Sequence, residues 1–240
     1  DIFSDNVAIN IHMNNNARFK PIGTYEGSVG YGDDWLYQAS GAGMLFKPKF
    51  QTIATLKIGN VHSFTSDEAA SLFGGIEEES KAEKLMGNLS TSTPPLDQDR
   101  YASPAERMFS VNFIQKITET ATLRGNVDYS YSKSQYDYDI QRNFYDGDEN
   151  IIIDQGINSL SASHAPSFSI VYKNNAPTSY LNNSLFGKAT FLRNDLPTTE
   201  NGQALMQQQS MRDYYIGNNF SYSWRRKKLR WRLSSSVLLF

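Results

Sequence analysis

The sequence lacks cysteine, long apolar runs and an excess of positive charge. None of its 240 residues is Cys, which excludes a disulfide framework and a thiolate metal site. No apolar run approaches the roughly 20 residues that a transmembrane helix requires. The formal net charge is -2, so nothing in the charge balance points to nucleic acid, and we expect no nucleic-acid partner.

Histidine is also scarce, and chemical motifs are missing. His12, His62 and His164 are far apart and follow no ligand spacing, whereas a zinc site needs several close nitrogen or sulfur ligands. We find no nucleophile elbow, no glycine loop that would cradle a phosphate and no paired-carboxylate motif. We therefore expect no catalytic residue, no cofactor and no metal site, and hence not an enzyme.

Aromatic residues are abundant instead. They make up 13% of the chain, with 14 Tyr and 14 Phe, and they occur with β-branched residues in short runs typical of strands. The mean hydropathy of -0.51 would ordinarily indicate a soluble protein. That index is a poor guide for β-barrels, because only one face of each strand meets lipid and the outer loops are polar.

Period-two alternation is the main structural signal. In 119–133, one face carries Ala121, Leu123, Gly125, Val127, Tyr129 and Tyr131, and the other carries Thr122, Arg124, Asn126, Asp128 and Ser130. In 212–224, Tyr214, Ile216, Phe220, Tyr222 and Trp224 share a face, which Asn218 interrupts. Similar alternation predicts further strands at 23–32, 35–46, 50–61, 108–116, 166–173, 180–192 and 229–240.

The predicted connections alternate in length. Tight ones lie at 47–49, 116–118, 174–178 and 225–228, and long ones at about 62–106, 138–163 and 193–210. A transmembrane β-barrel has this asymmetry, with short periplasmic turns and long extracellular loops. The basic residues at 225–228 then fit a charged turn beside lipid headgroups.

Two folds explain the alternation, since it cannot by itself distinguish a β-sandwich from a membrane barrel. Three observations favour the barrel: the rhythm of the connections, small residues (Gly125, Gly187, Ala189) on the apolar face, and aromatics near strand ends. The predicted membrane-interface aromatics are Trp35, Tyr129, Tyr131, Tyr222, Trp224 and Trp231. The polar residues predicted to line the lumen are Arg124, Asn126, Asp128, Asn219 and Ser221. Leu123, Val127, Phe220 and Tyr222 enclosed between two stacked sheets would instead indicate the sandwich.

Several phrases resemble a known family. Asn6 to Met13, then Gly23 to Gly32, then Gly43 to Gln51 resemble the plug-to-barrel junction of TonB-dependent outer-membrane receptors. The resemblance is greatest to the Bacteroidetes branch with a carboxypeptidase-regulatory-like N-terminal domain. Tyr101 to Lys116, Ser169 to Asn175 and Tyr180 to Asn183 resemble barrel strands of that branch, so the similarity runs along nearly the whole chain.

The resemblance implies an all-β fold, an antiparallel up-and-down transmembrane β-barrel. Residues 1–14 would be the end of the plug or its junction, and 15–240 a partial barrel with about 9–10 strands of a roughly 22-stranded whole. Both chain ends also suggest a piece of a longer protein. The implied function is nutrient uptake across the bacterial outer membrane. The implied partners are outer-membrane lipid, the remaining barrel and plug, the TonB energy-coupling complex and a surface lipoprotein.

Alternatives remain at this stage. The barrel could be a small one of about ten strands, or a surface scaffold that transports nothing, or a small barrel with a catalytic site in its outer loops. The acidic segment 137–150 contains oxygen ligands around Gly147. Such ligands could bind calcium, but their spacing does not match the twelve-residue EF-hand loop, and the segment is more typical of a solvated outer loop.

Overall fold

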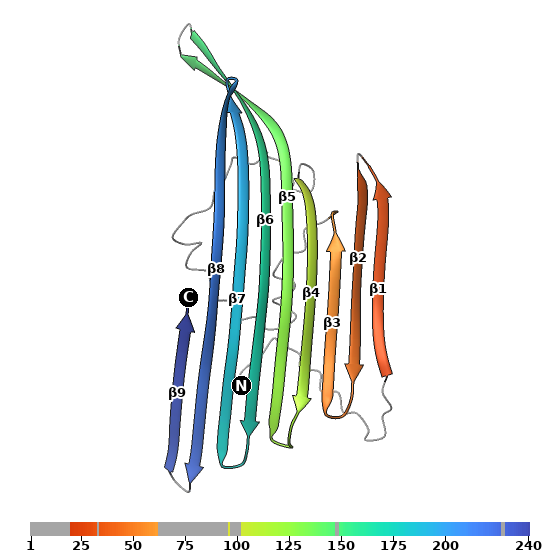
Figure 1. The fold of residues 1–240 in the computed structure, drawn as a ribbon, viewed down its shortest axis with the longest axis vertical. Helices are drawn as coiled ribbons and strands as arrows, with labels where there is room; N and C mark the ends of the chain where they lie inside the picture. Colours follow the sequence, from red (N-terminus) through yellow and green to blue (C-terminus); the bar gives the residue numbers. More distant parts are fainter. Residues whose placement is uncertain (1–19, 33, 62–95, 97–101, 147–148, 227–228) are drawn as a thin grey trace.

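The computed structural model describes residues 20–32, 34–61, 96, 102–146, 149–226 and 229–240. These residues form one antiparallel sheet of nine strands, in which every strand pairs with its neighbours in the sequence (Figure 1). The topology is therefore up-and-down throughout. The predicted all-β, antiparallel, up-and-down fold is confirmed, and the sheet is consistent with part of a barrel wall.

The strands are long, and the nine strand segments predicted between residues 23 and 240 are all present, while the alternation predicted at Val7 to Met13 lies outside the described residues. Their bounds are β1 Lys20–Tyr31, β2 Trp35–Phe46, β3 Phe50–Gly59, β4 Ala102–Lys116, β5 Ala121–Asp146, β6 Glu149–Asn175, β7 Ser179–Glu200, β8 Gln203–Arg226 and β9 Leu229–Leu239. The expected tight connections lie between β2 and β3, β4 and β5, β6 and β7, and β8 and β9. We call the end of the sheet that they occupy the tight-turn end.

The prediction of long loops is wrong for two of the three segments, because these two segments form paired strands. The β5 and β6 strands stay paired from Ala121↔Asn174 to Asp146↔Glu149. The β7 and β8 strands stay paired as far as Glu200↔Gln203. Segments 138–163 and 193–210 are thus the upper parts of two long hairpins. Of the third, 62–106, residues 102–106 begin β4 and nearly all the rest lies outside the described residues.

The turn between β7 and β8 shows how such a long hairpin is closed. Asn201 and Gly202 both have positive φ angles, 48° and 79°. Two successive left-handed residues form the turn that matches the twist of paired strands, and Asn-Gly is its preferred sequence. The turn dipeptide therefore fixes the register of the whole upper part of β7 and β8.

Between the tight turns and the level of Tyr131, the register places most apolar residues of the strands on one side of the sheet. One row of paired residues crosses all nine strands on this side: Gly23, Gly43, Ala54, Val111, Val127, Phe168, Gly187, Ile216 and Leu239. We call it the Val127 side. The opposite side, which carries Asp128, we call the Asp128 side.

No second sheet covers the Val127 side among the described residues. Val127 is 52% exposed, and Tyr214 and Leu233 are 66% and 63% exposed. Leu123, Phe220 and Tyr222 are half-buried by neighbours in the same sheet. The sandwich alternative is therefore wrong for this part of the chain. Nor does any helix here have the length and apolar character needed to span a membrane.

Glycines on the Val127 side make room for aromatic rings. Phe113 lies directly opposite Gly125, and Phe168 directly opposite Gly187. A Cβ built on Gly187 would lie only 2.6 Å from Cε1 of Phe168, and one on Gly125 would collide with the Phe113 ring. Each ring lies over the backbone of the next strand, an arrangement known to fix register between strands.

Candidate functional site: two sides of one sheet

The Asp128 side carries a cross-strand network of polar side chains on β4 and β5. Nδ2 of Asn126 donates to Oδ1 of Asn112 at 2.6 Å and to Oδ1 of Asp128 at 3.3 Å. Nδ2 of Asn112 in turn donates to Oγ of Ser110 at 3.1 Å. Ser110 is fully buried. The network holds these polar groups in fixed positions.

All five residues predicted to line a lumen lie on the Asp128 side. The structure brings Asn126 and Asp128 together, with Arg124 next along β5. Asn219 and Ser221 lie three strands away on β8, where Oγ of Ser236 donates to Oδ1 of Asn219 at 2.6 Å. The five residues thus form two groups, and their contact with a solute stays a prediction.

The predicted interface aromatics all lie on the Val127 side. Trp35, Tyr222, Trp224 and Trp231 lie near strand ends as expected, whereas Tyr129 and Tyr131 lie inside β5, because that strand continues to Asp146. Trp224 and Trp231 face each other across β8 and β9 beside the last tight turn, with Tyr222 and Leu233 as the next pair. At the hairpin tip of β1 and β2, Trp35 meets Tyr31 edge to face, with ring centroids 5.5 Å apart. Contact of these aromatic residues with a membrane interface stays a prediction.

Tyr129 and Tyr131 lie at the opposite end of the apolar stretch of β5. Both surround His164 of β6. The Tyr129 hydroxyl and Nδ1 of His164 are 2.8 Å apart, and the rings of Tyr131 and His164 are 4.7 Å apart. A second cluster of amphipathic rings thus lies far from the tight-turn end.

Two amides on the Val127 side, Asn183 and Asn218, are paired with each other. Asn218, which interrupts the apolar face of β8, donates through Nδ2 to Oδ1 of Asn183 at 3.0 Å. An isolated amide in hydrocarbon would leave donors and acceptors unsatisfied at a cost of several kcal/mol. The pair reduces this cost, so the interruption is compatible with an apolar environment.

The polarity of both sides reverses beyond Tyr131. On β5 the Val127 side runs through apolar residues as far as Tyr131 and then continues with Lys133, Gln135, Asp137 and Asp139. We call the rows from the tight turns up to and including Tyr131 the apolar band, and the strand segments beyond it the upper hairpins. On the other side of the upper hairpins the residues become apolar: Tyr136, Tyr138, Ile157, Leu192, Leu196 and Met211.

The upper hairpins contain three of the six buried apolar side chains among the described residues. Ile157 is 2% exposed, Met211 5% and Leu196 6%. Sequence reasoning missed these residues because it treated their segments as loops. The available signal was the phase of the alternation, which moves from odd positions up to Tyr131 to even positions from Tyr136.

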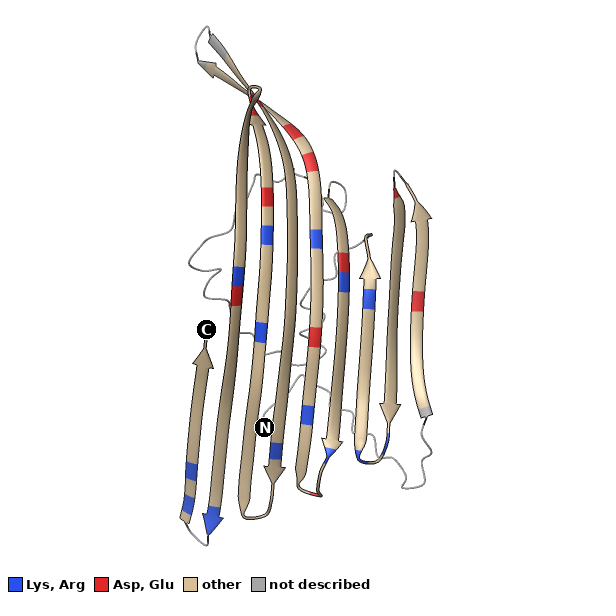
Figure 2. Cartoon of the chain, viewed as in Figure 1, with Lys and Arg blue, Asp and Glu red and all other residues tan. Residues whose placement is uncertain are grey.

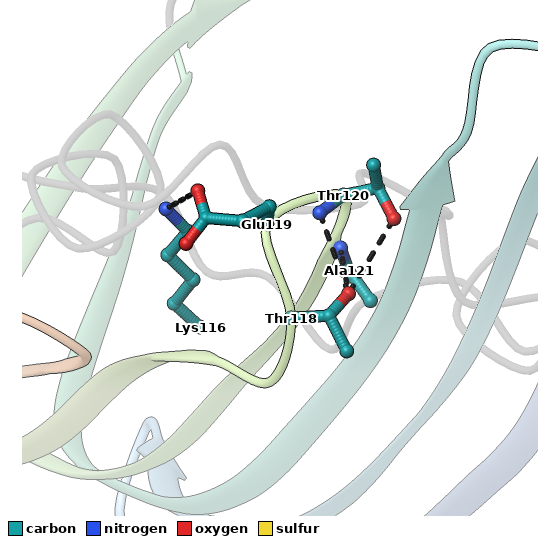
Figure 3. Close-up of polar contacts among 5 residues, drawn as sticks. All are labelled: Lys116, Thr118, Glu119, Thr120 and Ala121. Atoms are coloured by element: carbon teal, nitrogen blue, oxygen red, sulfur yellow. Dashed lines mark hydrogen bonds and ion pairs between the residues drawn. The ribbon is translucent and has the colours of Figure 1, made fainter.

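Charged groups are distributed unevenly along the strands. In Figure 2, Lys and Arg predominate at the tight-turn end, and several Asp and Glu lie toward the upper hairpins of β5 and β7. At the turn between β4 and β5, Nζ of Lys116 donates to Oε2 of Glu119 at 2.7 Å (Figure 3). This hydrogen bond and the positive charge of Lys116 lower the pKa of Glu119.

The same turn is closed by Thr118. Its Oγ1 accepts hydrogen bonds from the backbone N–H of Ala121 at 3.0 Å and of Thr120 at 3.3 Å (Figure 3). Such side-chain bonds replace the backbone partners that a tight turn lacks. The tight connection therefore has its own local stabilisation.

Another charged cluster lies in the upper hairpin of β7 and β8. Nε2 of Gln208 donates to Oδ1 of Asp195 at 2.6 Å, and Nε of Arg193 donates to Oδ2 at 2.8 Å. The hydrogen bond from Gln208, together with the bond and charge of Arg193, lowers the pKa of Asp195. The Val127 side is thus ionic at this height.

The predictions about metal binding, the histidines and the plug junction fall largely on residues that the structure does not describe. The described residues contain no group of three or more His, Asp or Glu placed to hold a metal ion. Gly147 and Asp148 of the acidic segment lie outside them, so calcium binding there stays untested. His12, His62 and the predicted junction at residues 1–14 also lie outside the described residues.

No family model matches the chain, and no curated protein matches it either. Among solved structures it is similar to the RagAB peptide transporter, with 11% identity over 90% of this chain and 31% of that chain, at a TM-score of 0.42. Two RagAB peptide importer structures also match. The "open-open" state shows 10% identity and a TM-score of 0.38, and the "closed-closed" state shows 12% and 0.36.

This chain covers 31% of each of those chains. At such low identities and TM-scores the likeness is no evidence of function.

Proposed function

We propose that this chain forms part of the wall of an outer-membrane β-barrel that takes part in nutrient uptake. One observation carries the proposal: across the nine described strands the Val127 side is apolar over a band of membrane depth, and no other described residues cover it.

The depth follows from strand geometry. The apolar band on β5 runs from Ala121 to Tyr131. A membrane strand needs about 9–11 residues when tilted, and the outward apolar belt of such barrels is roughly 25 Å tall. The reversal of polarity after Tyr131 therefore comes where the far membrane surface would lie.

The exposure argues against water on the Val127 side. Val127, Ile216 and Leu239 belong to one row of paired residues that is apolar on every strand, and these three side chains are 52%, 43% and 61% exposed. Monomeric soluble proteins rarely expose contiguous apolar patches larger than a few hundred Å². Contact with lipid hydrocarbon would make this exposed apolar surface favourable. The backbone would tolerate such contact, because the antiparallel ladder already satisfies the N–H and C=O groups between neighbouring strands.

The two edge strands of the sheet are also consistent with a segment of a larger barrel wall. Within the sheet, β1 and β9 each pair on one side only, and an open edge in a bilayer leaves backbone groups unsatisfied. We therefore propose that further strands complete the barrel, about 22 strands in total as in plugged transporters. Direct closure into a small barrel of about ten strands is the structural alternative.

The Asp128 side supports passage of a solute. It concentrates the amides and charges of Asn112, Asn126, Asp128 and Arg124, as expected of a lumen wall. In the finer form of the proposal the barrel is TonB-dependent and of the Bacteroidetes type. It would work with a plug, the energy-coupling complex and a surface lipoprotein, by gated passage with no covalent step.

A single-cysteine experiment tests the orientation of the sheet. Because the chain has no native Cys, each variant carries one label. In reconstituted vesicles, bimane at Val127→Cys or Ile170→Cys should be quenched by brominated lipid. Bimane at the neighbouring Asn126→Cys and Ser169→Cys should escape quenching and react instead with hydrophilic thiol reagents. Equal quenching on both sides would overturn the proposed orientation.

Transport is tested separately from orientation. A strain lacking the protein should grow more slowly on one of a panel of oligopeptides, oligosaccharides or metal chelates as sole source. An uncoupler of the inner-membrane proton gradient should abolish the protein-dependent uptake. Unchanged growth on every member of the panel would favour the surface-scaffold alternative.

A further inference from the structure

The last row of the apolar band carries cations on the Val127 side. Five paired residues cross β4 to β8 in this row: Arg107, Tyr131, His164, Phe191 and Arg212. Arg107, His164 and Arg212 are exposed. Lys133 follows Tyr131 by two residues and lies on the same side. We call Arg107, Lys133 and Arg212 the cationic rim.

Aromatic rings position the rim. The guanidinium carbon of Arg107 lies 5.6 Å from the centroid of the Tyr131 ring. That ring lies 4.7 Å from His164, which meets the Tyr129 hydroxyl. A guanidinium over a ring keeps its outer N–H donors available for an anion. Arg107 is thus held in place without being neutralised.

The rim has a clear contrast in the next row. There Arg193 is neutralised by Asp195 at 2.8 Å. Among the residues that the structure describes, no carboxylate pairs with Arg107, Lys133 or Arg212. Between this row and the tight turns, the Val127 side of the described strands carries no charged residue. The three cations therefore coincide with the boundary of the apolar band.

If the Val127 side faces lipid, the position of the three cations along the strands indicates which part of the membrane they contact. An outward Arg is costly at the bilayer midplane and nearly neutral close to the interface. The rim lies at the end from which the long hairpins extend, which is the outer end of such barrels. A cation at this height meets the headgroups of the outer leaflet.

We propose that the cationic rim binds the phosphates of a phosphorylated lipid of the outer leaflet. Guanidinium groups bind phosphate through paired N–H donors, and Tyr131 and Phe191 would contact the sugar and chain of the same lipid. The acyl chains would lie along the Val127 side below the rim. The inference rests on the proposed function, because it needs that side to face lipid.

The test uses the protein in phosphatidylcholine nanodiscs that contain lipid A, or lipid A stripped of its phosphates. Native mass spectrometry after mild delipidation measures the retained lipid. The wild-type protein should retain the phosphorylated form at least about tenfold better, since each basic residue near a charged membrane surface adds to affinity. The triple variant R107Q/K133Q/R212Q should lose this preference, while R107K/R212K should keep part of it.

Lys188→Gln is the matched control, because it removes one positive charge from the Asp128 side of β7 and should leave lipid retention unchanged. Equal retention of both lipids by the wild-type protein would overturn the inference, and that arm needs no variant to fold. Release of the lipid by millimolar inorganic phosphate would assign the rim to free phosphate and also overturn it. Quenching at Val127→Cys in the same nanodiscs separates failure of the rim from failure of the lipid-facing orientation.

Discussion

The lower and upper parts of β5 form one continuous strand but have opposite polarity. From Ala121 to Tyr131 the Val127 side is apolar, and from Lys133 to Asp139 it is charged or polar. The backbone pairing with β6 continues unchanged through both parts. Since the hydrogen-bond ladder is the same, the difference must come from what each part contacts, which we take to be lipid below and water above.

The opposite side of the strands shows the complementary change. Below Tyr131 the Asp128 side carries an amide network, and above it Tyr136 and Tyr138 stack with ring centroids 5.9 Å apart. Ile157, Leu196 and Met211 in the upper hairpins are buried, whereas Val127, Ile216 and Leu239 of the apolar band remain exposed. The upper hairpins thus follow the rule of soluble sheets, and the apolar band follows that of membrane barrels.

The largest expected effect comes from a charge in the apolar band. Val127→Arg should destabilise the folded protein in vesicles by about 2–4 kcal/mol, the cost of an outward Arg near the bilayer midplane. Gln135→Arg, on the same side of the same strand but in the upper hairpin, should change stability by less than about 0.5 kcal/mol. Urea unfolding in vesicles measures both. Equal costs would remove the distinction between the two parts.

The next effect concerns the buried side of the upper hairpins. Ile157→Ala should cost about 2 kcal/mol or more, since it leaves a cavity at a side chain that is 2% exposed. Val127→Ala should cost less, because lipid chains adapt to the lost methyl groups. The same unfolding assay compares the two variants. A larger loss for Val127→Ala would reverse the assignment of the buried side.

A smaller effect is expected at the glycines beneath aromatic rings. Gly187→Ala should destabilise by about 1 kcal/mol, because the added Cβ would displace the Phe168 ring. Gly43→Ala is the matched control in the same row, since nothing lies within 4 Å of its Cβ. Heat-modifiable gel mobility and unfolding midpoints report the difference. Indistinguishable variants would show that the ring position does not matter.

The smallest effect is the pH dependence of the β7 and β8 upper hairpin. The folded pKa of Asp195 is lowered by Gln208 and Arg193, so its stabilisation is present above the unfolded pKa and is lost as pH falls through the folded pKa. Amide exchange in this hairpin should speed up in acid, after correction for the intrinsic pH dependence of exchange. Asp195→Asn should weaken that response, and the exchange of β5 within the apolar band should not respond to the variant.

The strands were predictable from sequence because alternation is a local property. Val127 and Asp128 show their opposite faces without knowledge of any partner strand. The extent of the upper hairpins was not predictable in this way. Polar residues at 158–163 and the phase change after Tyr131 resemble a loop until Glu149–Asn175 is seen paired with β5.

The candidate sides were predictable, but the contacts within them were not. The five polar residues expected to line the lumen do share the Asp128 side. The pairing of Asn126 with Asn112 depends on register between β4 and β5, which alternation leaves open. Likewise, Gly125 was predicted as a small residue against lipid, and only the register shows that Phe113 lies across from it.

The amide pair of Asn183 and Asn218 has a consequence for how this sequence can drift. Loss of either amide would leave the other without its hydrogen-bond partner on the apolar side, so each single substitution should lower the stability of the protein. Replacing both by leucine would remove the need for a partner. Homologues should accordingly carry two amides or two aliphatic residues at these positions, and seldom one of each.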